Sequence, residues 1–126
     1  MSKQAVASPK LPPPVGPFSP AVQYGELLFV SGQVGVNPTT GKLADGIEAQ
    51  TEQALSNLDA ILDAAGRTLN DAVRVGVYVT DMSHFARMNA AYAKHFAQPY
   101  PARTTIGVAA LPLGALVEID MWVKMR

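Results

Sequence analysis

The chain has 126 residues, of which 48% are hydrophobic and 16% are charged, and its ten basic and ten acidic side chains cancel. This composition predicts a single domain, residues 1–126, with enough apolar material for a core, and it excludes a disordered chain. A neutral charge and a pI near 6.7 argue against a nucleic-acid partner, because a duplex-binding domain normally carries a basic surface.

Other site classes are excluded by what the sequence lacks. Cysteine is absent, so there are no disulfides, no thiol nucleophile and no cysteine-ligated metal. The two histidines, His84 and His95, lack the spacing of a paired metal site, and we expect no bound metal. No run of about 20 apolar residues is present, so no membrane span is expected. No export or import leader is recognisable, which favours a cytoplasmic protein.

The N-terminal third begins with an arm. Six of the ten prolines lie in the first 20 residues, so residues 1–14 are predicted to form an extended Pro-rich arm that becomes ordered near VGPFSPAV. The following segment, YGELLFVSGQVGV, has a β-rich core between Gly25 and Gly32 and is compatible with one or two strands. NPTTGK then predicts a turn.

Two helices follow from apolar spacing. Apolar residues recur every three or four positions over 47–65, which predicts a helix, and Gly66 suits the left-handed residue that ends one. Ser83 is the expected N-cap of a second helix. Its apolar face would comprise Phe85, Met88, Tyr92 and Phe96. The prolines of QPYPAR would end that helix.

Three strands complete the pattern. Residues 71–80 alternate, with Val73, Val75, Val77 and Val79 on one face. RTTIGVAAL and ALVEIDMWVKM read as two strands around Pro112–Gly114. The order β-β-α-β-α-β-β predicts an α+β fold, with one sheet and both helices packed on one face. The other face, with Tyr78 and Trp122, would lie in water, which predicts that copies of the chain associate.

Elimination leaves arginine and carboxylate chemistry. The sequence has no serine–histidine motif and no phosphate-binding glycine loop, whereas Arg103 follows the rigid PYP segment and Glu118 lies within ALVEIDMW. If the last two strands formed a hairpin, Arg103 and Thr105 would project on the same face as Glu118 and Asp120. Such a group is either an ordinary salt bridge or an anion site with a general base. A register slip of one residue would separate the two sides.

Six segments, in this order, resemble the RidA/YjgF family of reactive-intermediate deaminases: GPFSPAV, FVSGQVGVNPTTGKL, QTEQALSNLDAIL, VGVYVTDMSHFARMNAAYAKHF, PARTTIGVAALP and VEIDMW. The resemblance covers roughly residues 15–126. It implies a chorismate-mutase-like fold and a homotrimer with three clefts between neighbouring subunits. It also implies hydrolysis of 2-imino acids and their enamine tautomers, of the 2-aminoacrylate and 2-iminobutyrate type, to 2-oxo acids and ammonia. Neither a metal nor an organic cofactor is implied.

The resemblance also assigns roles to residues. Arg103 would hold the substrate carboxylate, and Glu118 would hold a water with help from the backbone carbonyl of Thr105. Further positions near the cleft are Phe18, Ser31, Gly32 and Asn89. On pattern alone, Asn89 is equally a helix-surface amide, and Ser31–Gly32 is equally a bulge.

Two positions depart from the family pattern. Phe18 stands where many imine-hydrolysing members have Tyr, and Thr105 stands where well-known members have Cys. Both changes make the pocket more apolar and leave the substrate open.

Four functions are therefore weighed. The first is a broad imine deaminase, and the second is a specialised catabolic enamine deaminase of the 2-aminomuconate type. The third is a non-catalytic trimer that binds small molecules or protects proteins, and the fourth is an endoribonuclease. The presence of both Arg103 and Glu118 favours an enzyme over the third function. Neutral charge counts against the fourth.

Overall fold

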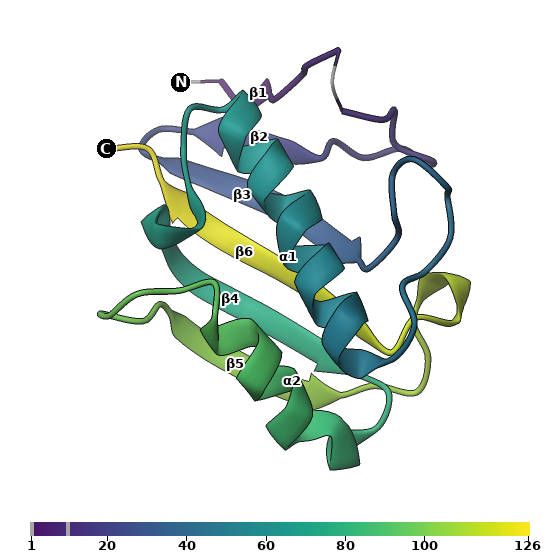
Figure 1. Cartoon of the computed structure of the whole chain (residues 1–126). Coiled ribbons are helices and arrows are strands. Elements are labelled where there is room, and N and C mark those ends of the chain that lie inside the picture. Colours follow the sequence, from purple (N-terminus) through teal and green to yellow (C-terminus); the bar gives the residue numbers. More distant parts are fainter. Residues whose placement is uncertain (1, 10) are drawn as a thin grey trace.

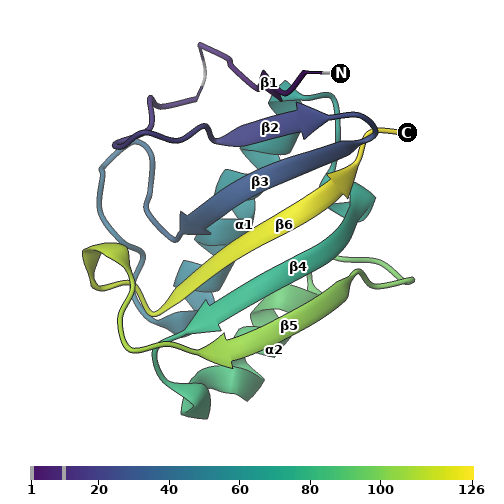
Figure 2. The same cartoon turned by 180° about the vertical axis from the view of Figure 1, so that it is seen from behind.

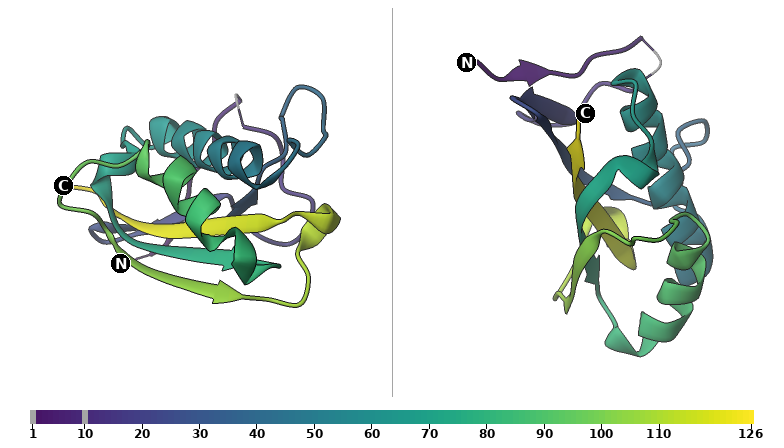
Figure 3. Two further views of the ribbon diagram at one scale, coloured as in Figure 1. Left: turned by 60° about the horizontal axis from the view of Figure 1, so that its bottom comes forward. Right: turned by 90° about the vertical axis from the view of Figure 1, so that its left-hand side faces the viewer.

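One mixed sheet carries both helices on a single face (Figures 1 and 3). The computed structural model describes residues 2–9 and 11–126, and its sheet runs β1-β2-β3-β6-β4-β5. The strands are β1 (Gln4–Ala5), β2 (Ala21–Tyr24), β3 (Leu27–Val34), β4 (Ala72–Val79), β5 (Ala102–Gly107) and β6 (Val117–Lys124). The helices are α1 (Ile47–Ala64) and α2 (Phe85–Ala93). Viewed from behind, the sheet is bare (Figure 2). The predicted α+β layering is confirmed.

The core lies between β6 and the helices. The apolar face of β6 is fully buried at Val117, Ile119, Met121 and Val123. α1 packs Leu55, Leu58 and Leu62 against them. Each such side chain contributes on the order of 1.5–3 kcal/mol when fully buried. The alternation predicted for this strand is therefore confirmed.

α1 is fixed to the sheet near its middle. The Nδ2 of Asn57 donates to the carbonyl oxygens of Val34 and Val36, at 3.2 and 2.8 Å. The helix ends as expected, with Gly66 at a φ of 72° and the Arg67 N–H donating to the Leu62 oxygen at 2.8 Å. The two Asn57 bonds hold the far end of β3 in place.

The second helix begins differently from the prediction. The Asp81 carboxylate accepts the Ser83 N–H at 2.9 Å, and a 3₁₀ turn, Met82–His84, leads into α2. Ser83 is therefore not the cap, because the ionised Asp81 two residues earlier is the stronger acceptor.

The predicted core face of α2 is largely confirmed. Met88, Tyr92 and Phe96 are buried, whereas Phe85 is 37% exposed. The helix ends at Ala93, earlier than predicted, so Phe96 packs on the core from beyond the end of the helix.

The predicted C-terminal hairpin is wrong. β5 pairs with β4 in parallel at the sheet edge, and β6 lies antiparallel between β3 and β4. α2 is the crossover that a parallel β4–β5 pair requires. β6 lies in the middle of the sheet. At an edge of the sheet, part of the apolar surface of its four fully buried side chains would be exposed to water.

Two local details also differ from the expected pattern. Val73 is 42% exposed, because the register shifts between Ala72 and Arg74 and Ala72 takes the buried place. The N-terminal arm adds a strand, since Gln4 and Ala5 pair with β2. Among the described residues, no helix has both the length and the apolar character needed to cross a membrane.

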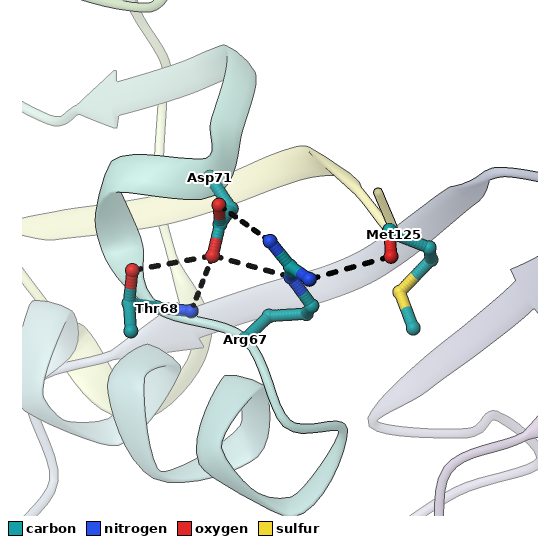
Figure 4. Close-up of polar contacts among 4 residues, drawn as sticks. All are labelled: Arg67, Thr68, Asp71 and Met125. Carbon is teal, nitrogen blue, oxygen red and sulfur yellow. Dashed lines mark hydrogen bonds and ion pairs between the residues drawn. The ribbon is translucent and has the colours of Figure 1, made fainter.

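A polar cluster ties the end of α1 to β4 and the C-terminus (Figure 4). Arg67 Nη2 lies 2.7 Å from Asp71 Oδ1, and Arg67 Nη1 donates to the Met125 oxygen at 3.3 Å. Asp71 Oδ2 also accepts the Thr68 N–H at 2.9 Å and its hydroxyl at 3.2 Å. These bonds, above all those from Arg67, hold the pKa of Asp71 below its usual 3.8.

Replacing Asp71 by Asn is expected to lower the free energy of unfolding by about 1 kcal/mol near neutral pH, because charge-assisted capping bonds are lost. Since the folded pKa is depressed, this contribution is complete above pH 3.8 and disappears as the pH falls through the lower folded value. Urea unfolding of both proteins across pH 2.5–7 measures the difference. Asp59→Asn, on the exposed side of α1, is the control. A difference that did not change with pH would contradict this account.

Candidate functional site

Glu118 lies on the open face of β6, against bare backbone. Its Cα pairs with Val34 of β3 and with Tyr78 of β4. The β3–β6 register shifts between Val30 and Gln33, and this irregularity includes Gly32. A Cβ on Gly32 would lie 2.8 Å from the Glu118 Cδ and closer still to its Oε2. The structure thus brings Gly32 and Glu118 together, and a larger residue at position 32 would force the Glu118 carboxylate to move from its present place.

The surroundings of Glu118 make its carboxylate a stronger base. Partial burial raises its pKa, and the nearby negative charge of Asp120 raises it further. A higher pKa increases the affinity of the carboxylate for a proton taken from water.

A shallow hollow lies on the same face, next to Gly32. Ser31 donates its hydroxyl to the Ser19 oxygen at 2.6 Å and its N–H to the Pro20 oxygen at 2.9 Å, which holds the GPFSP segment against β3. The hollow has a volume of about 320 Å³, and it is lined by Phe18, Ser19, Val22, Phe29, Val30, Ser31, Asp120 and Trp122. Phe18 and Ser31 therefore share a site wall with the Glu118 strand.

Arg103 lies in a different environment, under α2. It pairs with Val75 on β4, so its side chain is on the helix-covered face. Its Nη2 donates to Asn89 Oδ1 at 2.6 Å. Its Cζ lies 4.7 Å from the centroid of the Tyr92 ring and 5.8 Å from that of Phe85. The predicted pair of Arg103 and Asn89 is brought together.

The aromatic partners of Arg103 were not expected from the sequence. Phe85, Asn89 and Tyr92 stand four and three residues apart on α2, so they share one helix face. The apolar pattern had assigned Phe85 and Tyr92 to the core alone. The sequence did contain one signal for this contact, because the Asn89 amide stands between Phe85 and Tyr92 at helical spacing.

Thr105 lies two residues after Arg103, on the same side of β5, opposite Val77. Its hydroxyl oxygen is buried and has no hydrogen-bond partner among the residues that the structure describes. β5 is the edge strand of the sheet, so its outer backbone groups face away from β4.

The two halves of the predicted site lie on opposite faces of the sheet. Tyr78 pairs with Glu118 and with Ile106, whereas Val77 pairs with Thr105, so Arg103 and Thr105 point away from the Glu118 face. The expectation of one shared face within a chain is wrong, because it depended on the hairpin that does not form. Phe18, Ser31, Gly32 and Glu118 form a carboxylate half, and Arg103, Thr105 and Asn89 form an arginine half.

Comparison with known proteins identifies the relatives of this chain. The family model described as Endoribonuclease L-PSP, the YjgF/RidA family, matches residues 9–125. This chain belongs to the RidA/YjgF family. A RutC family protein of Pyrococcus horikoshii is 44% identical over 119 residues, which is 94% of each chain. The 2-iminobutanoate/2-iminopropanoate deaminase of Dermatophagoides farinae is 38% identical over 119 residues, 94% of this chain and 93% of that protein.

Solved structures of relatives have the same fold. RidA from the Antarctic bacterium Psychrobacter is 43% identical and superposes with a TM-score of 0.91, over 96% of this chain and 98% of that one. The RidA/YjgF relatives carry two kinds of activity in their names, endoribonuclease and imine deaminase. The first is the description of the family model, and the second is the name of the relative from Dermatophagoides farinae.

Proposed function

We propose that this protein hydrolyses reactive 2-imino acids and their enamine tautomers, of the 2-aminoacrylate and 2-iminobutyrate type, to 2-oxo acids and ammonia. The observation that carries the proposal is the Glu118 carboxylate, whose pKa is raised and which is seated against the bare backbone of Gly32. The name of the deaminase relative from Dermatophagoides farinae supports the same chemistry.

The complete site would form between two copies of the chain. Within one chain the arginine and carboxylate halves face away from each other, but Arg103 and Thr105 lie on β5, at the edge of the sheet. A neighbouring copy that covers the open sheet face would bring its own edge strand toward Glu118. In a closed threefold ring each copy gives one half to each neighbour, which makes three sites. Exposed apolar residues of the open face, such as Trp122 and Ile106, both 46% exposed, support an interface there.

Arg103 would bind the carboxylate of the substrate. A guanidinium has five N–H donors, and the observed bond to Asn89 occupies one of them, so a bidentate pair with a carboxylate remains available. Asn89 and the Tyr92 ring fix the plane of the guanidinium. The bound carboxylate would hold the adjacent C2 atom, the electrophilic carbon of the imine, at a constant position.

Glu118 would then move the protons. It takes a proton from a bound water as the water oxygen bonds to C2, and the electron pair of the C=N bond passes to nitrogen. The backbone carbonyl of Thr105 from the neighbouring copy would accept the second water hydrogen. Glu118 returns the proton to this nitrogen, which gives the carbinolamine. Glu118 then takes the proton of the carbinolamine hydroxyl and passes it to the nitrogen as the C–N bond breaks, so the oxygen forms the C=O bond of the 2-oxo acid and ammonia leaves. Imine plus water balances the products, so the reaction consumes no cofactor.

The hollow on the carboxylate half supports substrates with an apolar side chain. Phe18, Phe29 and Trp122 contribute three aromatic rings to its lining, and Phe18 lacks the hydroxyl of a tyrosine. A semicarbazide-trap assay, with imines generated by an amino-acid oxidase from a panel of amino acids, tests the function directly. Hydrolysis of small apolar imines is the expected result. Activity confined to a larger dicarboxylic enamine would favour the specialised catabolic enzyme, and activity on none would favour a binding protein.

Replacing Glu118 by Gln is expected to lower kcat at least about a hundredfold, because a general base typically contributes 10²–10⁴-fold. Affinity for a 2-oxo acid product should stay within a few fold. Arg103→Lys should instead raise KM strongly, because a point charge cannot make the bidentate fork. Kinetics together with calorimetry of pyruvate binding separate the two roles. Full turnover by E118Q combined with lost product binding would contradict the assigned roles.

Mixing two inactive variants tests whether the site is shared. R103A and E118Q should each be inactive alone. Unfolded together at equal amounts and refolded, they should regain about a quarter of wild-type turnover, because each mixed threefold ring contains one intact interface out of three. Light scattering of the refolded sample checks its mass. Absence of recovery in mixed trimers would contradict a site built from two copies.

A further inference from the structure

We propose that Tyr78 and Asp120 form a positioning pair for Glu118. The Tyr78 hydroxyl holds the Asp120 carboxylate by a hydrogen bond, and this bond keeps the hydroxyl away from the Glu118 carboxylate. The proposal rests on the proposed function for its effect on turnover. The effect of the pair on the titration of Glu118 does not depend on that function.

The pair crosses the open face diagonally. Tyr78 stands opposite Glu118 in the β4–β6 ladder, and Gly76 stands opposite Asp120. The Tyr78 hydroxyl nevertheless donates to Asp120 Oδ2 at 3.0 Å, one cross-strand row away. The ring therefore leans along the strand, away from the residue it faces across the ladder.

Gly76 provides the space for this arrangement. A Cβ at position 76 would lie 2.9 Å from the Tyr78 hydroxyl and closer still to Asp120 Oδ1. A larger residue at this position would force the Tyr78 hydroxyl, the Asp120 carboxylate or both to shift. Two glycines therefore flank β6, Gly32 beside Glu118 and Gly76 beside Asp120.

The surroundings of Glu118 make Asp120 its main charged neighbour. On its own strand the nearby carboxylate is Asp120, and across β4 lies Tyr78. On the β3 side its neighbours are Gly32 and Val34. Arg74, further along β4, has its guanidinium 5.8 Å from the Trp122 ring centroid.

Titration should respond to both members of the pair. Burial and the bond to Asp120 raise the pKa of Tyr78, so its hydroxyl remains a donor. The negative charge of Asp120 is one cause of the raised pKa of Glu118. The Tyr78 hydroxyl offsets part of that charge, so both residues act through Glu118.

The test uses full-length protein labelled with ¹³Cδ-glutamate, which gives four carboxyl signals from Glu26, Glu48, Glu52 and Glu118. The signal missing from E118Q assigns Glu118. Its titration midpoint should fall by about half a pH unit or more in D120N, because a neighbouring like charge is removed. The midpoint should rise in Y78F, because the carboxylate of Asp120 is no longer offset by a donor. D120E should restore a midpoint close to that of the wild type, and D59N is the control.

Opposite shifts distinguish positioning from a general loss of structure, which would move both midpoints toward the solvent value. If D120N does not fold, the sign of the Y78F shift decides. Unchanged midpoints, or midpoints that move in the same direction, overturn the proposal. In the imine assay the acid limb of the pH profile should follow the Glu118 midpoint in each variant. A wild-type protein without imine hydrolysis would overturn the proposed function, while the NMR midpoints would still decide the pair.

Discussion

The whole arrangement depends on the two-sided character of β6. Its odd-numbered residues are apolar and fully buried under the helices, and its even-numbered residues carry two carboxylates and a tryptophan on the open face. Because side chains alternate strictly along a strand, the register that buries Ile119 also places Glu118 on the other side. Core stability and site geometry are therefore set by the same hydrogen-bond ladder, and a slip of one residue would destroy both.

The elements could be predicted from the sequence because they are local. The spacing in 47–65 and the alternation in β6 each report one buried face, and both predictions agree with the structure. Strand partners are not local, and nothing within RTTIGVAAL or ALVEIDMWVKM tells which strand each joins. Adjacency in sequence favoured a hairpin, but the four fully buried side chains of β6 favour a central place for that strand, between β3 and β4. Val73 and Ser83 differ for a smaller reason, since one bulge and one ionised cap shift the pattern by a residue or two.

The candidate site shows the same division. Residue types and their motif could be read from the sequence, and Gly32 does lie against Glu118, as Asn89 does against Arg103. The relation between the halves could not be read, because it depends on whether β5 pairs with β6 or with β4. The parallel pairing turns Arg103 toward α2, where Tyr92 and Phe85 flank it. The apolar spacing alone explained both aromatic residues as core residues, so it gave no reason to expect their contact with Arg103.

In the candidate site, the two faces of the sheet carry groups of opposite charge, with carboxylates on the open face and the Arg103 guanidinium on the helix-covered face. Glu118 and Asp120 share the open face, and partial burial together with the negative charge of Asp120 raises the pKa of Glu118. Tyr78 donates its hydrogen bond to Asp120, and within residues 2–9 and 11–126 no side chain donates one to the Glu118 carboxylate. Arg103, on the opposite face, has neutral partners in Asn89 and the rings of Tyr92 and Phe85. In the proposed assembly, a carboxylate that lacks a cation would lie near a cation that lacks a carboxylate. In that proposed site, an anionic substrate would have Arg103 as the partner of its carboxylate and Glu118 as the base beside its electrophilic carbon.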